Sequence, residues 1–214
     1  RLLEAGVSPS EITDLFLTHL HYDHCVDYAY LVLSRWDQGV GKIPELRVVA
    51  PEPCARMTEQ LVGKEGAFGP DLDARTHHPG SEFIYEMRGG TLPRPPPSPQ
   101  VTEVSHGDTV QGEGWTLRVA EVQHCQPQLV CLAYRLEIGG KAIVFGGDTA
   151  PVDSLTELAR SADVLVHMCH MINGVVTDPR ITDCCSGHLD AARTATEAGV
   201  RTLVLVHITE QLEQ

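Results

Sequence analysis

The stretch THLHYDHC, residues 18–25, places three histidines and an aspartate within six residues. His19 and His21 lie two positions apart, so on an extended segment their side chains point to the same side. Asp23 and His24 follow where the chain is expected to turn into a helix. Such side chains pack poorly into an apolar core, but they are common ligands of divalent metal ions. The spacing therefore predicts two imidazoles for one ion, and a carboxylate plus an imidazole for a second.

Three further candidate ligands each follow an apolar run of the sequence. His124 ends WTLRVAEVQH, Asp148 follows KAIVFGG, and His207 ends TLVLVH. If these runs are strands, each can carry its polar residue to one common rim of a sheet. Any one of the three alone reads equally well as a structural residue. Together with the residues of THLHYDHC they make seven potential ligands, which is enough for two adjacent ions.

Composition limits the classes of partner and compartment. The chain has 214 residues, of which 42% are hydrophobic, so it can bury a sizeable core as one globular domain. Sixteen Lys and Arg against 29 Asp and Glu give a net charge of −13, which disfavours polyphosphate chains and anionic membranes. No apolar run reaches the roughly 18 residues of a membrane-spanning helix. Seven cysteines without a framework spacing indicate reduced thiols in a soluble, cytoplasmic protein.

Helical and strand-like patterns alternate along the chain. Antiparallel strands in the middle and β-α-β alternation near both ends predict a layered α/β fold. Residues 63–100 are rich in Gly, Pro and charge, and are expected to form a loop or excursion. Adjacent Cys184 and Cys185 suggest a redox pair, but two unpaired thiols are the preferred interpretation. Helices are expected from Pro9, over 25–37, after Pro51, and over 154–161 and 189–198; strands are expected over 15–19, 46–50, 101–105, 115–123, 131–138, 141–145, 163–167 and 202–207.

The motifs THLHYDH, the His at 124, GGDT at Asp148 and the late His207 resemble the five-part signature of the metallo-β-lactamase superfamily. The runs AYRLEIGGKAIVFGGDTAPVDSLTELARSADVLVHMCH and SGHLDAARTATEAGVRTLVLVHIT resemble its tRNase Z and arylsulfatase-like branch in particular. The resemblance covers residues 11–207 apart from the excursion, and it implies an α/β fold, the αββα sandwich, as a single domain over residues 1–214. It also implies two Zn²⁺ per chain, with Mn²⁺ or Fe as alternatives. By this resemblance His19, His21 and His124 hold one ion, Asp23, His24 and His207 hold the second, and Asp148 bridges them.

Two departures from that branch bear on the substrate. Met168 stands where the branch carries a Glu that pairs with the proton-donor His, a position that His188 matches here. Only 24 positions (148 − 124) separate His124 from Asp148, which leaves no room for the long tRNA-clamping arm. With the acidic net charge, these departures favour a small-molecule ester over tRNA and make nucleic acid a disfavoured partner.

These observations predict a binuclear zinc hydrolase that uses a metal-bridging hydroxide to hydrolyse a small phosphodiester or phosphotriester. Asp148 is expected to orient the hydroxide, and Asp23 is expected to act at the second ion. His188, or with less support His170, is expected to protonate the leaving group. Aryl sulfatase and lactonase or β-lactamase activity at the same site are alternatives, since the fold does not fix the bond that is cut. An alternative of another class is a non-catalytic scaffold stabilised by metal.

The ends of the sequence depart from the family pattern. Members usually begin with a β-hairpin region and continue past the last His with another helix and strand. This sequence starts at the helix before the His cluster and stops seven residues after His207. We therefore expect an incomplete version of the fold that lacks the usual first strands and last helix and exposes sheet edges. Partner copies are expected to cover those edges in a homo-oligomer.

Overall fold

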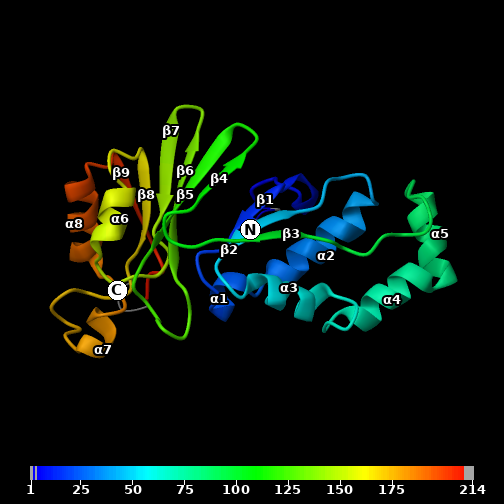
Figure 1. Cartoon of the computed structure of the whole chain (residues 1–214), viewed down its shortest axis with the longest axis horizontal. Helices are drawn as coiled ribbons and strands as arrows, with labels where there is room; N and C mark the ends of the chain where they lie inside the picture. Colours follow the sequence, from blue (N-terminus) through cyan, green and yellow to red (C-terminus); the bar gives the residue numbers. More distant parts are fainter. Residues whose placement is uncertain (1, 3, 210–214) are drawn as a thin grey trace. The chain divides into compact units, whose positions relative to one another are not determined.

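The computed structural model describes residues 2 and 4–209 and divides into two compact units (Figure 1). Unit 1 comprises Arg1–Leu17 and His21–Glu103, and unit 2 comprises Thr18–Leu20 and Val104–Gln214. The prediction of a single domain over residues 1–214 stays a prediction. Within the described residues, none of the helices has both the length and the apolar character needed to cross a membrane.

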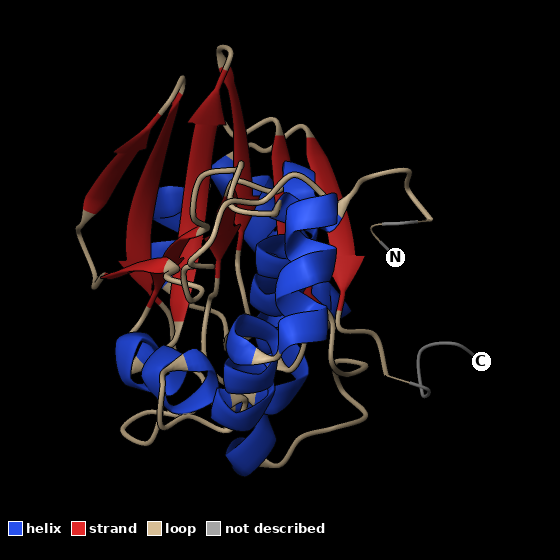
Figure 2. Ribbon diagram, turned by 90° about the vertical axis from the view of Figure 1, so that its right-hand side faces the viewer, coloured by secondary structure: helices blue, strands red, loops and turns tan. Residues whose placement is uncertain are grey.

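Unit 1 is built on a parallel three-stranded sheet in the order β1-β2-β3. Figure 2 shows the helices of the chain in blue and the strands in red. A capping box begins the helical turn expected from Pro9, where the Ser8 N–H donates to the Glu11 carboxylate at 2.7 Å. The elements are η1 (Pro9–Glu11), β1 (Asp14–Phe16), α1 (Tyr22–Cys25), α2 (Tyr28–Gly39), β2 (Arg47–Ala50), α3 (Cys54–Val62), α4 (Gly69–His77), α5 (Pro79–Met87) and β3 (Gln100–Glu103).

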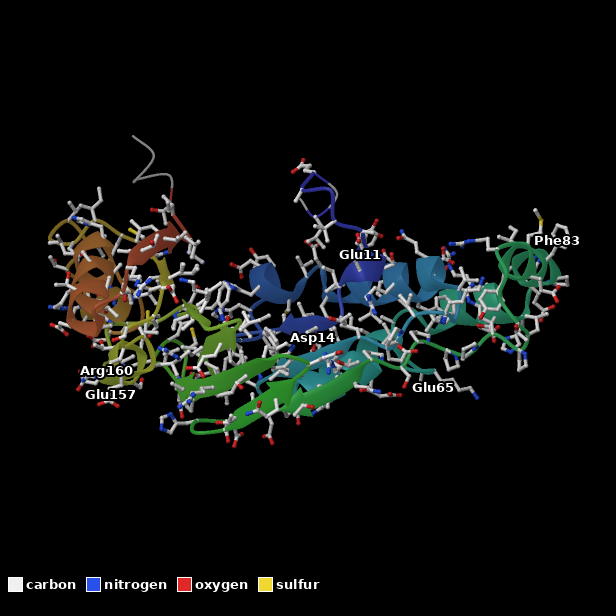
Figure 3. The ribbon with its side chains drawn as sticks, turned by 90° about the horizontal axis from the view of Figure 1, so that it is seen from above. Glu11, Asp14, Glu65, Phe83, Glu157 and Arg160 are labelled. Carbon is white, nitrogen blue, oxygen red and sulfur yellow. The ribbon has the colours of Figure 1, made fainter. Side chains whose placement is uncertain are left out.

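The excursion at residues 63–100 contains the two helices α4 and α5, so the prediction of a loop there was wrong. A proline lies in the first turn of each helix, where its missing N–H costs nothing. These prolines therefore start helices instead of marking a loop. Leu72 of α4 and Tyr85 of α5 are buried, whereas Phe83 projects from α5 into solvent (Figure 3).

A charge cluster fixes this excursion to helix α2. The Asp37 carboxylate accepts hydrogen bonds from Arg75, Arg88 and Arg94 at 3.5, 3.2 and 3.1 Å. The Arg94 guanidinium is buried, and its central carbon lies 3.6 Å from the centroid of the Trp36 ring. Burial raises the pKa of Asp37, but the hydrogen bonds from Arg94 and Arg88 outweigh it, so the pKa is lowered overall. The Asp37 carboxylate is thus held in its charged form by the excursion that it anchors.

Replacing Asp37 by Ala is expected to reduce the free energy of unfolding by about 2–3 kcal/mol, because buried Arg94 loses its charged acceptor. Urea denaturation measures this change. Because the folded-state pKa is depressed, the wild-type advantage should be present above the usual carboxyl pKa of about 3.9 and should fade as the pH falls below it. In the control Asp73→Ala, which removes an exposed pair with His77, the change should stay below about 1 kcal/mol. Equal effects of the two substitutions would contradict the anchoring role.

Unit 2 is built on a six-stranded sheet in the order β4-β5-β6-β7-β8-β9. Neighbouring strands are antiparallel from β4 to β7, and β7, β8 and β9 are parallel. The expected strands and helices of this half are found, while β4 and α7 were not predicted. The elements are β4 (Thr109–Gly112), β5 (Trp115–Glu121), β6 (Leu132–Ile138), β7 (Lys141–Phe145), α6 (Asp153–Leu158), β8 (Val164–Met168), α7 (Pro179–Thr182), α8 (His188–Ala198) and β9 (Thr202–Val206).

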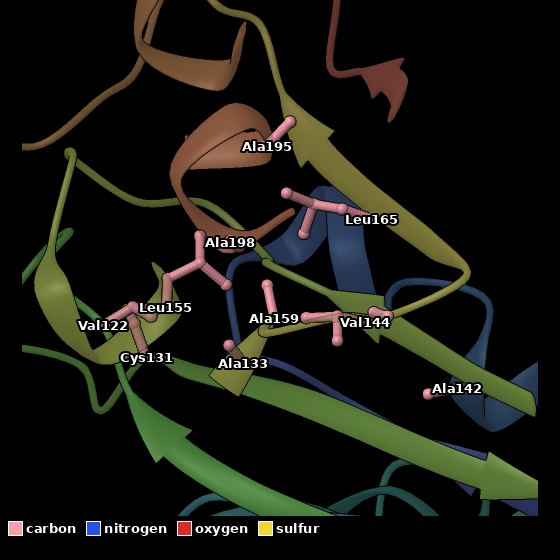
Figure 4. Close-up of a cluster of buried hydrophobic side chains, with 11 residues drawn as sticks. Val122, Cys131, Ala133, Ala142, Val144, Leu155, Ala159, Leu165, Ala195 and Ala198 are labelled. Carbon is pink, nitrogen blue, oxygen red and sulfur yellow. The ribbon is translucent and has the colours of Figure 1, made fainter. Parts of the chain in front are cut away.

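The core of unit 2 lies between this sheet and helices α6 and α8. Figure 4 shows Leu155 of α6 and Ala195 and Ala198 of α8 packed with Val144 of β7 and Leu165 of β8. The small alanines allow α8 to approach the sheet closely, and burial of this apolar surface supplies the main driving force for the packing. The two helices form the crossovers between β7, β8 and β9, so they fix the three strands in one direction.

Candidate metal centre

The candidate ligands of unit 2 follow strands that point the same way. His124 follows β5, Asp148 follows β7, His170 follows β8, and His207 follows β9 directly. Strands β7, β8 and β9 are parallel, and β5 has the direction of β7 because both are antiparallel to β6. The carboxyl ends of these strands therefore meet at one edge of the sheet, where ligands of α/β proteins commonly bind.

Asp148 is the centre of this cluster. Its Oδ2 atom lies 3.2 Å from His207 Nε2 and 3.8 Å from His124 Nε2. The ring of His19 meets the ring of His124 edge-on, with centroids 5.4 Å apart. Asp148 and His19 are buried, with 5% and 0% of their surface exposed, whereas the His207 side chain is 28% exposed. The Oδ2 atom of buried Asp148 thus faces the Nε2 atoms of His124 and His207.

His19 reaches the cluster because the short segment Thr18–Leu20 packs onto unit 2. The Leu132 N–H donates to the Thr18 carbonyl oxygen at 2.9 Å. Gly147 permits this approach: its φ is +62°, and a Cβ there would lie 3.0 Å from Thr18 Cβ. Any larger residue at 147 would therefore push the segment that carries His19 away from the segment that carries Asp148.

Backbone groups orient His124 and the segment after Asp148. The His124 Nδ1–H donates to the Cys184 carbonyl oxygen at 2.7 Å, which leaves Nε2 to face Asp148. The Ser186 hydroxyl donates to the Thr149 carbonyl at 2.7 Å, and the Ser186 carbonyl accepts from the His170 N–H at 2.9 Å. Residues 184–186 therefore fix the positions of His124, of the segment after Asp148 and of His170.

His207 has a backbone φ of 55°, in the left-handed region that non-glycine residues rarely adopt. It occupies this conformation directly after β9, where its side chain meets Asp148. Strained backbone of this kind is concentrated at functional sites, where the surrounding structure compensates its cost of about 1–3 kcal/mol.

A fifth polar residue, His170, lies against His207. The two Nδ1 atoms are 3.4 Å apart, and the ring centroids are 5.4 Å apart. Burial and then the neighbouring His207 lower the pKa of His170, an effect that Asp148 opposes. A lowered pKa favours the neutral imidazole near pH 7.

His188, the predicted proton donor, lies in a different setting. It is the first residue of α8, and among the residues that the structure describes its ring hydrogen-bonds only to the Asn173 N–H, at 3.4 Å. The side chain of Met168 is buried, and its sulfur accepts from the Thr149 N–H at 2.9 Å. The structure therefore brings His170, and not His188, into contact with the Asp148 cluster.

The remaining predicted ligands belong to unit 1 and begin two residues after His19. His21 is the N-cap of α1, and Asp23 and His24 lie within that helix, as the sequence predicts. Asp23 Oδ2 lies 3.4 Å from His24 Nε2, and Asp23 is exposed. Their assignment to a second metal ion stays a prediction.

The chemistry of the donor atoms in unit 2 fits a divalent metal ion. The cluster consists of three imidazoles and the Asp148 carboxylate, and zinc is bound by ligands of these types. Hydrogen bonding of His124 Nδ1 to a carbonyl is the usual outer contact of a ligating histidine.

Comparison with known proteins places the chain in a family. A family model described as a β-lactamase superfamily domain matches residues 3–208. The chain is 33% identical over 213 residues to a protein named ribonuclease Z from Mycobacterium bovis, covering 97% of this chain and 71% of the relative. It is 34% identical over 213 residues to a ribonuclease Z from Mycobacterium sp. strain KMS, covering 97% and 69%.

Solved structures share the fold. The short form of human tRNase Z superposes with a TM-score of 0.68 at 17% identity, covering 99% of this chain and 78% of that one. The metallo-β-lactamase fold protein YhfI from Bacillus subtilis gives a TM-score of 0.67 at 18% identity, covering 97% and 70%. Zn²⁺-bound PqqB from Methylobacterium extorquens gives 0.56 at 14% identity, covering 92% and 62%. The predicted α/β metallo-β-lactamase fold is confirmed, and a structure that shares it binds zinc.

The relatives overturn two predictions from the sequence. The sequence predicted a small-molecule phosphoester substrate and disfavoured both tRNA processing and nucleic-acid partners. Both predictions were wrong, because the relatives that match most of the chain are named ribonuclease Z. The prediction relied on a net charge of −13, but net charge describes the whole chain. Phosphodiester binding depends on charge at the site, where bound divalent ions supply the largest local positive charge.

The short separation of His124 and Asp148 in the sequence was likewise a weak guide to the substrate. It argues only against a tRNA-clamping arm between these two residues, and it says nothing about other RNA-binding surfaces. The family match over residues 3–208 spans all seven predicted ligand positions. The chain belongs to the metallo-β-lactamase superfamily of hydrolases, in the branch that contains the proteins named ribonuclease Z.

Proposed function

We propose that this protein is a metal-dependent ribonuclease that hydrolyses phosphodiester bonds of RNA, with transfer RNA as its substrate class. The observation that carries the proposal is the buried Asp148 carboxylate facing His124 and His207 in a chain 33% identical to a ribonuclease Z. A tRNase Z among the structural neighbours supports the choice of RNA.

The metal ions would be held by two groups of residues. His19, His124, His207 and Asp148 form the group seen in unit 2. His21 joins them in the proposal because it lies two positions after His19, at most about 7.6 Å away between Cα atoms. Asp23 and His24 follow on α1. When bound, two divalent ions lower the pKa of water and stabilise charge on the attacked and leaving oxygens.

The protein's own groups supply orientation and a proton. The Cys184 carbonyl fixes the ring plane of His124, and the left-handed backbone of His207 sets its angle to Asp148. Asp148 accepts hydrogen bonds and so can orient the attacking water. His170, beside His207, is proposed to act as a neutral imidazole that passes a proton to the leaving oxygen from one ring nitrogen and accepts one on the other.

The test compares three substrates with the metal-loaded protein: a transfer RNA carrying a 3′ extension, a DNA of the same sequence, and bis(4-nitrophenyl) phosphate. We expect cleavage of the RNA at discrete positions, with kcat/KM at least about 10³-fold above that for the chromogenic diester. Denaturing gels locate the cut, and Asp148→Ala controls for contaminating nuclease. Turnover of the chromogenic diester without cleavage of the RNA would refute the proposed substrate class.

A further inference from the structure

Two cysteines that the proposed reaction does not use lie beside His124. Cys184 and Cys185 follow helix α7, and their sulfur atoms are 3.7 Å apart. A ring nitrogen of His124 lies within 4.8 Å of both sulfurs. Cys184 is half-buried and Cys185 is buried, and none of the seven cysteines, all of them within the described residues, forms a disulfide.

Two hydrogen bonds hold this pair against the strand end that carries His124. The Gln123 side-chain amide donates to the Asp183 carbonyl at 2.8 Å, and the His124 ring donates to the Cys184 carbonyl at 2.7 Å. A solvent-open cavity is lined in part by Gln123 and His124. The backbone that carries the two thiols is therefore fixed beside His124.

The separation of the sulfurs matches a metal site. Two Zn–S bonds of about 2.3 Å at a tetrahedral angle place their sulfurs about 3.8 Å apart, which is the distance observed here. A disulfide requires about 2.05 Å between the sulfurs and, between adjacent residues, closes a strained ring. A side-chain rotation brings the His124 nitrogen from within 4.8 Å to the about 3.5 Å that a shared tetrahedral ion needs.

We propose that Cys184, Cys185 and His124 form an additional cation site, for a thiophilic divalent ion such as Cd²⁺ or Zn²⁺, which shares His124 with the Asp148 cluster. Two soft thiolates and an imidazole are a ligand set that selects such ions over Mg²⁺ or Mn²⁺. Binding displaces the two thiol protons. Because the Cys184 carbonyl also orients His124, an ion at this site rotates the imidazole away from Asp148 and inhibits hydrolysis.

The test titrates Cd²⁺ alone into the zinc-loaded full chain and follows sulfur-to-cadmium charge-transfer absorption, which a centre of histidines and aspartates cannot produce. We expect the band to saturate at about one cadmium ion per chain. Cys184→Ser and Cys185→Ser should both lose it, and Cys25→Ser, a half-buried cysteine of unit 1, should keep it. Circular dichroism establishes that each variant is folded. A band that survives both substitutions, or that never forms in wild type, overturns the site.

A second readout tests the sharing of His124 and rests on the proposed function. Saturating the thiolate band should lower RNA cleavage by at least about tenfold in wild type. The same cadmium concentration should spare Cys184→Ser. Charge-transfer absorption without selective inhibition of wild type overturns the sharing of His124. If no RNA is cleaved under any condition, the ribonuclease proposal fails, and the absorption result still decides the cation site.

Discussion

Replacing Asp148 by Ala is expected to lower kcat for RNA cleavage by about 10³-fold, equivalent to about 4 kcal/mol of transition-state stabilisation. The carboxylate oxygen faces His207 and His124 at 3.2 and 3.8 Å, so its removal takes away the group that these imidazoles share. Metal affinity should fall as well, because only the imidazoles remain as ligands in unit 2. Cleavage rates and elemental analysis of the purified variant measure the two effects.

A matched control separates this effect from the general loss of a carboxylate. Asp73 on α4 is exposed and pairs only with exposed His77 among the described residues. Asp73→Ala should retain the rate and metal content of wild type. An Asp148→Ala protein that cleaves RNA at the wild-type rate would show that the reaction takes place elsewhere on the molecule.

The second large effect is expected at His170. If it passes a proton to the leaving oxygen, His170→Ala should lower kcat by about 10²-fold or more while KM and metal content stay near wild type. Its Nδ1 lies 3.4 Å from that of His207, so it is near the cluster without being part of the Asp148 contacts. Single-turnover kinetics and elemental analysis distinguish a slow chemical step from a lost ligand.

His188→Ala is the comparison that decides between the two histidines. His188 hydrogen-bonds to the Asn173 N–H at the start of α8, so its loss should reduce kcat by less than the loss of His170. The reverse order would restore His188 as the proton donor. Loss of metal from His170→Ala would instead identify His170 as a ligand.

The sequence predicted the rim of the sheet because each ligand follows an apolar run. His124, Asp148 and His207 follow β5, β7 and β9, and the shared direction of these strands brings them together. This agreement arises because a buried strand needs a continuous apolar pattern, and the first polar residue after it falls at the sheet edge.

Other features of the site and the fold are not marked by any apolar pattern in the sequence. The carbonyl of Cys184 orients His124, but any residue type offers a carbonyl, so the sequence cannot indicate this role. The choice of His170 over His188 depends on a contact with His207, 37 positions away. Helices α4 and α5 were missed because Pro and Gly were interpreted as loop signals, although Pro is well tolerated in a first helical turn.

The segment Thr18–Leu20 has a consequence for how this molecule can be divided. Because these three residues belong to unit 2 while the residues before and after them belong to unit 1, no single break in the chain separates the units. A fragment beginning at Val104 would lack His19, and the Leu132 N–H would lose the Thr18 carbonyl that accepts its hydrogen bond. Recombination or limited proteolysis between Glu103 and Val104 therefore cannot transfer the Asp148 cluster intact. Any fragment that carries the whole cluster must therefore include residues from both sides of the bond between Glu103 and Val104.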